Sequence, residues 1–275
     1  MWTLTGFADE ISPDLDEQLD TLARESLRYL ELRAVWGKNV LRLDDAELAR
    51  VRQALDRQGV GVSSIGSPIG KIGVADDFAP HLEDFKRALH AAHVMGAPFV
   101  RIFSFYIPEG DDPARYRDEV LSRLGRLVEA ADGAGVTLLH ENERGIYGDT
   151  PARCRDLLAA LDSPLLRAAW DPANFVLCGV RPYTEGYDLL RPYIAYVHVK
   201  DARRDEGRVV PAGQGDGEVR ETLAALHDSG FDGFFSLEPH LKAAGQFSGF
   251  SGPALFGEAA QAFKALLREL DIPWR

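Results

Sequence analysis

The stretch Val136-Thr137-Leu138-Leu139-His140-Glu141-Asn142-Glu143 passes abruptly from a short apolar run to a cluster of titratable and polar side chains. A Gly-containing turn follows, and then Asp149-Thr150-Pro151 has the composition of a helix start. A short apolar run bounded in this way is typical of a buried parallel strand. The stretch therefore predicts a strand that delivers polar groups to its C-terminal end and is followed by a helix.

The same alternation of β-like runs and amphipathic helical segments recurs along all 275 residues. Strands are predicted for 2–7, 29–33, 60–65, 99–103, the opening run from 136, 166–171, 194–200 and 233–238. Helices are predicted after Ser12-Pro13, with Ser12 as the cap, and over 44–57, 85–95, 113–134, 151–161, 219–228 and 253–270. Eight such units about 30 residues apart are typical of a (β/α)8 TIM barrel. An open doubly wound sheet is the rival, but its first turn is usually glycine-rich, whereas Phe7-Ala8-Asp9-Glu10 is acidic. We expect one α/β domain over 1–275, a single barrel.

The overall charge restricts the partners of the chain. Lys and Arg number 31 against 43 Asp and Glu, which gives a net charge of −12. Such a charge repels a phosphate backbone, so we expect no nucleic-acid partner. The two cysteines form no disulfide framework, and no signal peptide or membrane-length apolar run is evident. A cytoplasmic protein with no membrane partner is expected, and homo-oligomerisation is left open.

Acid and imidazole side chains end the last four predicted strands. They are Glu141, Asp171, His198 and Glu238. In a barrel of this kind the C-terminal strand ends converge on one mouth, so these groups could meet around one ion. Three carboxylates and one imidazole suit a hard or borderline divalent cation. We expect one such ion, Mn²⁺ first, with Mg²⁺, Co²⁺ and Zn²⁺ as alternatives.

Several motifs carry a resemblance to a known family. They are Phe7-Ala8-Asp9-Glu10-Ile11-Ser12, His140-Glu141-Asn142-Glu143, Trp170-Asp171-Pro172-Ala173-Asn174, Val197-His198-Val199-Lys200-Asp201 and Leu237-Glu238-Pro239. The chain resembles the xylose isomerase-like TIM barrels, a group of sugar phosphate isomerases and epimerases. The resemblance implies that Glu141, Asp171, His198 and Glu238 are metal ligands. Asn174 departs from the family's pattern, because ketose 3-epimerases and endonuclease IV usually carry His at this position, three residues after the Asp of the sixth strand. Endonuclease IV also needs further histidines at strand ends that this chain lacks.

The resemblance implies a metal-dependent isomerase or epimerase of a sugar, sugar phosphate or cyclitol. Such an enzyme abstracts a proton and passes through a metal-bound enediolate, with Glu141 and Glu238 as the catalytic carboxylates. A metal-dependent lyase or dehydratase acting on a keto-sugar, inosose or glycoside would begin with the same step, so it remains an alternative. An AP-endonuclease-like barrel and a non-catalytic sugar-binding barrel are weaker alternatives.

Further residues near the predicted strand ends are candidates for binding a carbohydrate substrate. They are Glu143, Asn174, Lys200, Arg204 and His240. His140 should point away from the barrel axis, because side chains alternate along a strand. Glu31 and Arg33 share one face of the second strand and could pair with each other. The loop 213–218 follows the seventh strand, where TIM barrels often hold phosphate, but its Asp216 and Glu218 would repel an anion. The loop 67–73 with Lys71 is a better candidate for an anion, and the Ser- and Gly-rich loop 245–252 could be a lid or an anion site. A neutral sugar or cyclitol is slightly favoured over a phosphate.

Overall fold

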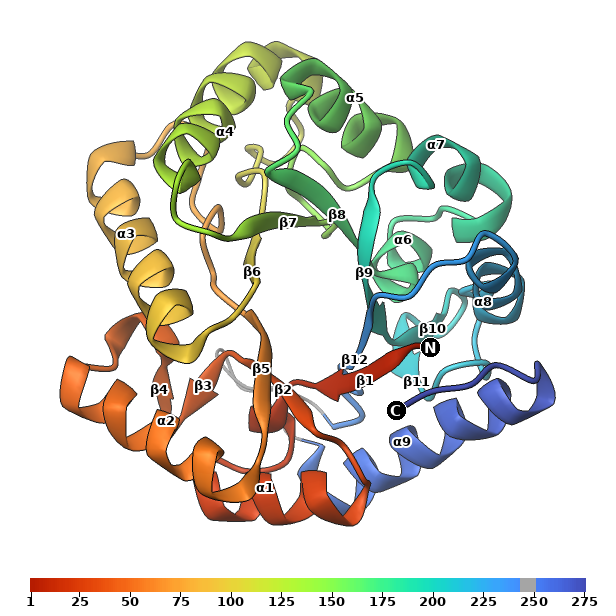
Figure 1. Ribbon diagram of the computed structural model, residues 1–275. Coiled ribbons are helices and arrows are strands. Elements are labelled where there is room, and N and C mark those ends of the chain that lie inside the picture. The colour runs from red at the N-terminus through yellow and green to blue at the C-terminus, as the bar shows by residue number, and fades with distance from the viewer. Residues whose placement is uncertain (243–250) are drawn as a thin grey trace.

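Eight parallel strands form the barrel in the computed structural model, which describes residues 1–242 and 251–275. In chain order they are β1 (Thr3–Gly6), β2 (Tyr29–Leu32), β5 (Gly61–Ile65), β6 (Phe99–Ile102), β7 (Thr137–Glu141), β8 (Leu166–Trp170), β9 (Ile194–Val199) and β12 (Phe234–Leu237). Their order in the sheet is β1-β12-β9-β8-β7-β6-β5-β2. A parallel bridge between Phe7 and Glu31 joins the two ends of that order. The predicted (β/α)8 TIM barrel is confirmed (Figure 1).

Helices surround the strands on the outside of the barrel (Figure 1). They are α1 (Leu15–Arg24), α2 (Asp45–Gln58), α3 (Phe78–Met95), α4 (Arg117–Ala131), α5 (Pro151–Leu161), α6 (Pro172–Leu177), α7 (Asp188–Leu190), α8 (Val219–Asp228) and α9 (Gly252–Glu269). Short 3-10 turns are η1 (Ala8–Glu10), η2 (Val40–Arg42) and η3 (Pro113–Tyr116), and η4 (Pro182–Tyr187) is a π-helix. The predicted bounds of α5 and α8 are confirmed, whereas α3 begins earlier than expected.

The start of α1 differs from the predicted one. Asp14, not Ser12, is the N-cap residue, and its carboxylate accepts a hydrogen bond of 3.0 Å from the backbone N–H of Glu17. Ser12 lies two residues before Asp14, and its hydroxyl accepts from the N–H of Asp14. Both residue types can cap a helix, so the local sequence alone did not decide between them.

Apolar side chains fill two separate layers. The larger core lies between the strands and the helices, as expected for a parallel sheet covered by helices. A smaller cluster of Leu139, Ala169 and Tyr196, with Phe99 and Phe234 against it, fills the barrel interior. The interior is therefore a packed core beneath the mouth, and it supports the residues at the strand ends from below.

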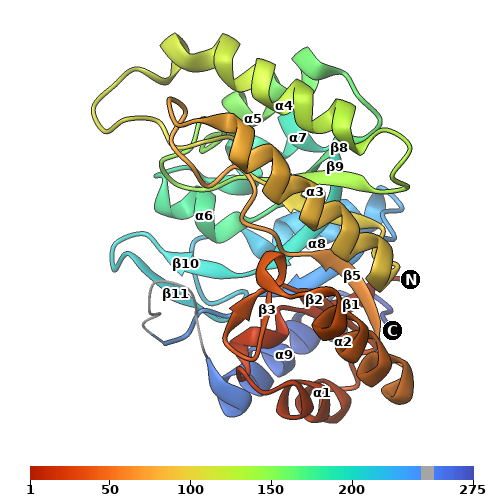
Figure 2. The same ribbon diagram turned by 90° about the vertical axis from the view of Figure 1, so that its left-hand side faces the viewer.

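Two short hairpins were not predicted. The strands β3 (Ala34–Val35) and β4 (Lys38–Asn39) pair after β2, and β10 (Asp201–Arg203) and β11 (Arg208–Val210) pair after β9. Figure 2 shows the β10–β11 hairpin at the end of the barrel away from both termini. The hairpins extend the mouth at two points of its rim.

The sequence analysis expected no membrane-spanning segment and suggested a lid or anion site at the loop 245–252. Among residues 1–242 and 251–275, no helix combines the length and the hydrophobicity needed to cross a membrane. The candidate lid or anion loop 245–252 lies outside the described residues, except for its last two positions.

Candidate metal centre

Four adjacent strands bring the predicted ligands together. Glu141 ends β7, Asp171 follows β8, His198 lies near the end of β9, and Glu238 follows β12. One ligand atom of each residue lies within 4.8 Å of the corresponding atom of every other. All four side chains are buried. Asp171 is also the N-cap of α6, where its Oδ1 accepts from the N–H of Asn174 at 2.9 Å.

The donor set fits a divalent cation. His198 Nδ1 and Asp171 Oδ2 are buried atoms that make no well-formed hydrogen bond, although each lies near a charged partner. The four ligand atoms lie close enough together for one divalent cation to be held by all four residues. Oxygen ligands with one imidazole favour a hard or borderline cation.

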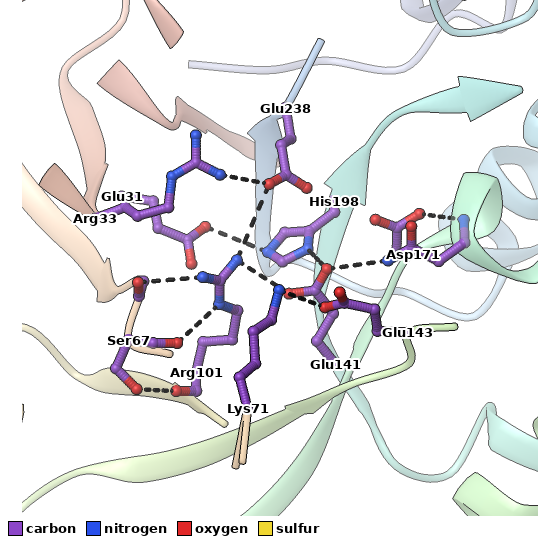
Figure 3. A network of polar contacts seen from close by, with 12 residues as sticks. Glu31, Arg33, Ser67, Lys71, Arg101, Glu141, Glu143, Asp171, His198 and Glu238 are labelled. Carbon is purple, nitrogen blue, oxygen red and sulfur yellow. Dashed lines mark hydrogen bonds and ion pairs between the residues drawn. The ribbon is translucent and has the colours of Figure 1, made fainter. Parts of the chain in front are cut away.

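Three cationic side chains are hydrogen-bonded or ion-paired with the cluster, and Figure 3 shows two of them, Arg33 and Arg101. Lys200 Nζ lies 2.8 Å from Asp171 Oδ2 and 2.9 Å from Glu238 Oε2. Arg101 Nη1 lies 3.1 Å from Glu141 Oε2, and Arg33 Nη1 lies 2.8 Å from Glu238 Oε1. These contacts orient the carboxylates, and they offset part of the cost of burying them.

The buried charges around the cluster do not balance. The carboxylates are those of Asp9, Glu10, Glu31, Glu141, Asp171 and Glu238, and the fixed cations are Arg33, Arg101 and Lys200. Six carboxylates thus face these three cations and the single imidazole of His198. Uncompensated charge is costly in a dry interior, so a divalent cation at the four-residue cluster would relieve most of the imbalance.

The acid–base properties of the cluster reflect the same imbalance. Burial outweighs the ammonium of Lys200 and raises the pKa of Asp171 to about 6. Burial would also raise the pKa of Glu141, but His198 and Arg101 together lower it to about 2. Burial disfavours the imidazolium of His198, yet Glu141 and Glu31 outweigh this and raise its pKa to about 10. Protons and a cation therefore compete for the same site.

A cavity of about 880 Å³ opens onto the cluster. Of the predicted substrate contacts, its wall includes Glu143, Asn174, Lys200 and His240. Arg204 is not brought to this cavity: its Nη2 donates to the carbonyl of Val180 at 2.8 Å, and it lines a separate groove. Asn174 lies close to the cluster, with Nδ2 3.3 Å from Glu141 Oε1.

Arg33 and Arg101 also line the cavity, and they were not among the predicted site residues. Arg101 lies in the apolar segment Phe99-Val100-Arg101-Ile102-Phe103, where a buried guanidinium requires an anionic or carbonyl partner. That signal was available in the sequence. Arg33 does not pair with Glu31 as suggested: it contacts Asp9 at 2.7 Å and Glu10 at 2.8 Å, besides Glu238.

In the two candidate anion loops that the structure describes, 67–73 and 213–218, the groups that could bind an anion already contact carboxylates of the protein itself. Lys71 Nζ lies 2.6 Å from Glu143 Oε2 and 4.3 Å from the centre of the Phe103 ring. In the 213–218 loop, the backbone N–H groups of Gly213, Gly215 and Gly217 all donate to the Asp201 carboxylate, at 2.8–2.9 Å. The second loop thus forms an anion nest that the protein fills with its own side chain.

His140 lies behind the cluster, away from the cavity, as strand alternation predicted. Its Nε2 is 2.9 Å from the hydroxyl of Ser104, and the side chain is buried. Burial lowers the pKa of His140 from its ordinary value of 6.5 to about 4. The ring is therefore neutral at pH 7 and packs as a polar core residue.

The depressed pKa of His140 predicts acid sensitivity. The unfolded chain takes up a proton near pH 6.5 and the folded chain only near pH 4. The stability contributed by neutral His140 is complete above pH 6.5 and is lost as the pH falls toward 4. Between pH 7 and 4.5 we expect a loss of about 2 kcal/mol from this residue. Urea unfolding of the chelator-treated protein would show His140→Gln losing less stability over this interval than the parent; equal losses would contradict the assignment.

Comparison with known proteins places this geometry in a family. Residues 19–271 match the family model described as "Xylose isomerase-like TIM barrel". The 2-epi-5-epi-valiolone 7-phosphate 2-epimerase of Actinoplanes sp. is 29% identical over 195 residues, 70% of this chain and 70% of that protein.

Solved structures share the fold. A D-tagatose 3-epimerase-like protein superposes with a TM-score of 0.79, at 19% identity, over 98% of each chain. The probable 3-DHS dehydratase AsbF of Bacillus anthracis superposes with a TM-score of 0.75, at 18% identity, over 96% of this chain and 99% of that one.

Proposed function

Because this chain belongs to the xylose isomerase-like TIM barrel family, we propose that it is a divalent-metal-dependent isomerase or epimerase of a sugar, sugar phosphate or cyclitol. The observation that carries the proposal is the buried cluster of three carboxylates and one imidazole, of which Glu141 and Glu238 line the cavity. An epimerase among the sequence relatives supports the same reaction class. Homologues that act on carbohydrates make a small carbohydrate the expected substrate class.

In this proposal Glu141, Asp171, His198 and Glu238 hold one cation, with Mn²⁺ as the expected ion. A divalent cation bound there would polarise a substrate carbonyl and stabilise the charge that develops on its oxygen. The remaining chemistry belongs to the chain. A carboxylate must remove the proton from the carbon beside that carbonyl, and a carboxylic acid must return it.

Glu141 and Glu238 are the proposed proton carriers. They enter the cluster from different strands, β7 and β12, and both line the cavity. Contacts from Arg33 and Lys200 fix both oxygens of Glu238, and a contact from Arg101 fixes Glu141. Two fixed carboxylates could serve the two faces of one substrate carbon. Return of the proton to the opposite face gives an epimer, and return to the adjacent carbon gives an aldose–ketose isomer.

The substrate-binding role is assigned to residues on the cavity wall. Lys200, whose ammonium bridges Asp171 and Glu238, is proposed to contact an oxygen of the substrate, which its position on the cavity wall supports. Asn174 and His240 supply further polar groups near Glu141 and Glu238. The pair of Lys71 and Glu143 offers one cation and one carboxylate to hydroxyl groups further out.

Hydrogen exchange tests the proposed reaction. With Mn²⁺ present in D₂O, ketoses, inososes and their phosphates should be screened for incorporation of deuterium next to the carbonyl. An isomerase or epimerase should return labelled substrate together with labelled isomer, detected by NMR. Elimination of water or an aglycone would instead identify a lyase that begins with the same proton transfer. Tight binding of a sugar without any exchange would show a non-catalytic barrel and overturn the proposal.

A further inference from the structure

Glu31 is a buried carboxylate beneath the cluster that the proposed reaction does not use. It lies in β2, with 1% of its surface exposed. Its Oε2 lies 3.3 Å from Nε2 of His198, on the side of the ring opposite to the cluster. The other ring nitrogen, Nδ1, lies 3.3 Å from Glu141 Oε1. Figure 3 shows the imidazole between the two carboxylates.

The position of Glu31 is unusual because it has little charge compensation. Among the described residues, His198 is the only side chain with which it forms an ion pair. A buried carboxylate destabilises the folded state unless a charged or hydrogen-bonding partner compensates its charge. The partner here is the one imidazole of the cluster. The structure thus shows a carboxylate in contact with the imidazole at the nitrogen that does not face the cluster.

A second set of contacts holds Glu31 itself. The phenol of Tyr196 donates to Glu31 Oε2 at 3.0 Å, and its oxygen lies 2.9 Å from the hydroxyl of Ser63. That hydroxyl lies 2.9 Å from the hydroxyl of Thr5. All of these groups are buried in the barrel interior. The carboxylate is therefore anchored from below by polar groups of three other strands, β1, β5 and β9.

We propose that Glu31 is a positioning residue, which holds the His198 ring so that Nε2 carries the proton and Nδ1 offers its lone pair to the cation. The inference rests on the proposed function, because it requires a divalent ion at the cluster. A carboxylate that accepts from the second nitrogen of a ligating histidine fixes its tautomer and orientation, and such partners typically change metal affinity about 10- to 100-fold. Glu31 itself is neither a ligand nor a base.

Metal affinity tests this role without a turnover assay. The chelator-treated protein would be titrated with Mn²⁺ by calorimetry as parent, Glu31→Gln and Glu31→Leu. Leucine removes the acceptor, so we expect affinity to fall about 10- to 100-fold. Glutamine keeps a carbonyl that can accept a hydrogen bond from Nε2–H. The Mn²⁺ affinity of Glu31→Gln should therefore be closer to that of the parent than to that of Glu31→Leu.

A matched control separates positioning from general damage to the barrel. Ser64 pairs with Glu31 in the register of β2 and β5, is equally buried, and has a hydroxyl without a hydrogen-bond partner. Ser64→Ala should leave Mn²⁺ affinity unchanged. Thermal melting of each chelator-treated variant would show that it is folded before titration.

These measurements distinguish a failure of the proposed function from a failure of the role proposed for Glu31. If the parent protein binds no divalent cation, the proposed function fails. If the parent binds Mn²⁺ and folded Glu31→Leu binds it equally well, only the role of Glu31 is overturned. A glutamine variant as weak as the leucine variant would also overturn it, because the negative charge of Glu31 rather than its placement of the ring would then account for the affinity.

Discussion

Glu238→Gln should reduce turnover by about 10²- to 10⁴-fold, the usual contribution of general acid–base catalysis. The substitution keeps the size of the side chain and leaves an oxygen that can still accept from Arg33 or Lys200. It removes the carboxylate that would receive the substrate proton. The fold should be retained, because the surrounding barrel core does not depend on this charge. The measurement is the rate of deuterium wash-in from D₂O with the best substrate of the screen.

Two controls make this result specific. The metal content of Glu238→Gln must be determined, because loss of the ion would also abolish turnover. Glu10→Gln is the matched control, because Glu10 also forms an ion pair with Arg33, with Oε1 2.8 Å from Nη2. Like Glu238→Gln, it removes one negative charge next to Arg33, but Glu10 is not among the residues that line the cavity. We expect that variant to keep most of its activity. Full activity in metal-loaded Glu238→Gln would exclude the role proposed for this residue.

Removal of the divalent ion is expected to have the second large effect. Dialysis against a chelator should lower turnover at least 100-fold, and Mn²⁺ or Co²⁺ should restore it, because the charge that develops on the substrate would lose its stabilising cation. The free energy of unfolding should rise when the ion is added back, by about 2.7 kcal/mol at one hundred times the dissociation constant. Six buried carboxylates facing three fixed cations give the physical reason.

The measurements are turnover, elemental analysis and thermal melting before and after readdition. Asp171→Asn serves as the matched control, because it weakens the cluster without touching either proposed proton carrier. It should bind Mn²⁺ more weakly than the parent and show a smaller rise in melting temperature. Turnover that survives complete removal of the ion would reject the metal-dependent reaction while leaving the fold and family unaffected.

The sequence predicted the barrel and the position of the cluster because both depend on regular patterns. Apolar runs about 30 residues apart determine where strands end, and strand ends in a barrel share one mouth. Glu141, Asp171, His198 and Glu238 could therefore be grouped without knowing any contact. The predicted orientation of His140 followed from strand alternation alone.

Features that depend on contacts across the barrel could not be predicted in this way. Strands of two or three residues, such as β3 and β10, are too short to show periodicity. The partner of Arg33 depended on η1 and β12 approaching β2 in space, so pairing with Glu31 was the wrong local choice. The position of Glu31 beneath His198 likewise follows from strands far apart in the chain, and the sequence pattern has no signal for it.

The carboxylate of Asp201 bears on how this scaffold could acquire new specificities. Three glycine N–H groups of the 213–218 loop and the N–H of Ala202 all converge on it. A descendant that came to recognise a phosphoester here would first have to lose Asp201, since the loop already satisfies its donors within the chain. A Cβ at Gly217 would lie 2.6 Å from an Asp201 oxygen, and one at Gly215 would lie 2.4 Å both from an Asp201 oxygen and from the backbone carbonyl oxygen of Ala202. Evolution of phosphate recognition at this loop would therefore begin with replacement of the resident acid, and it would keep Gly215, which the backbone of Ala202 excludes from exchange in any case.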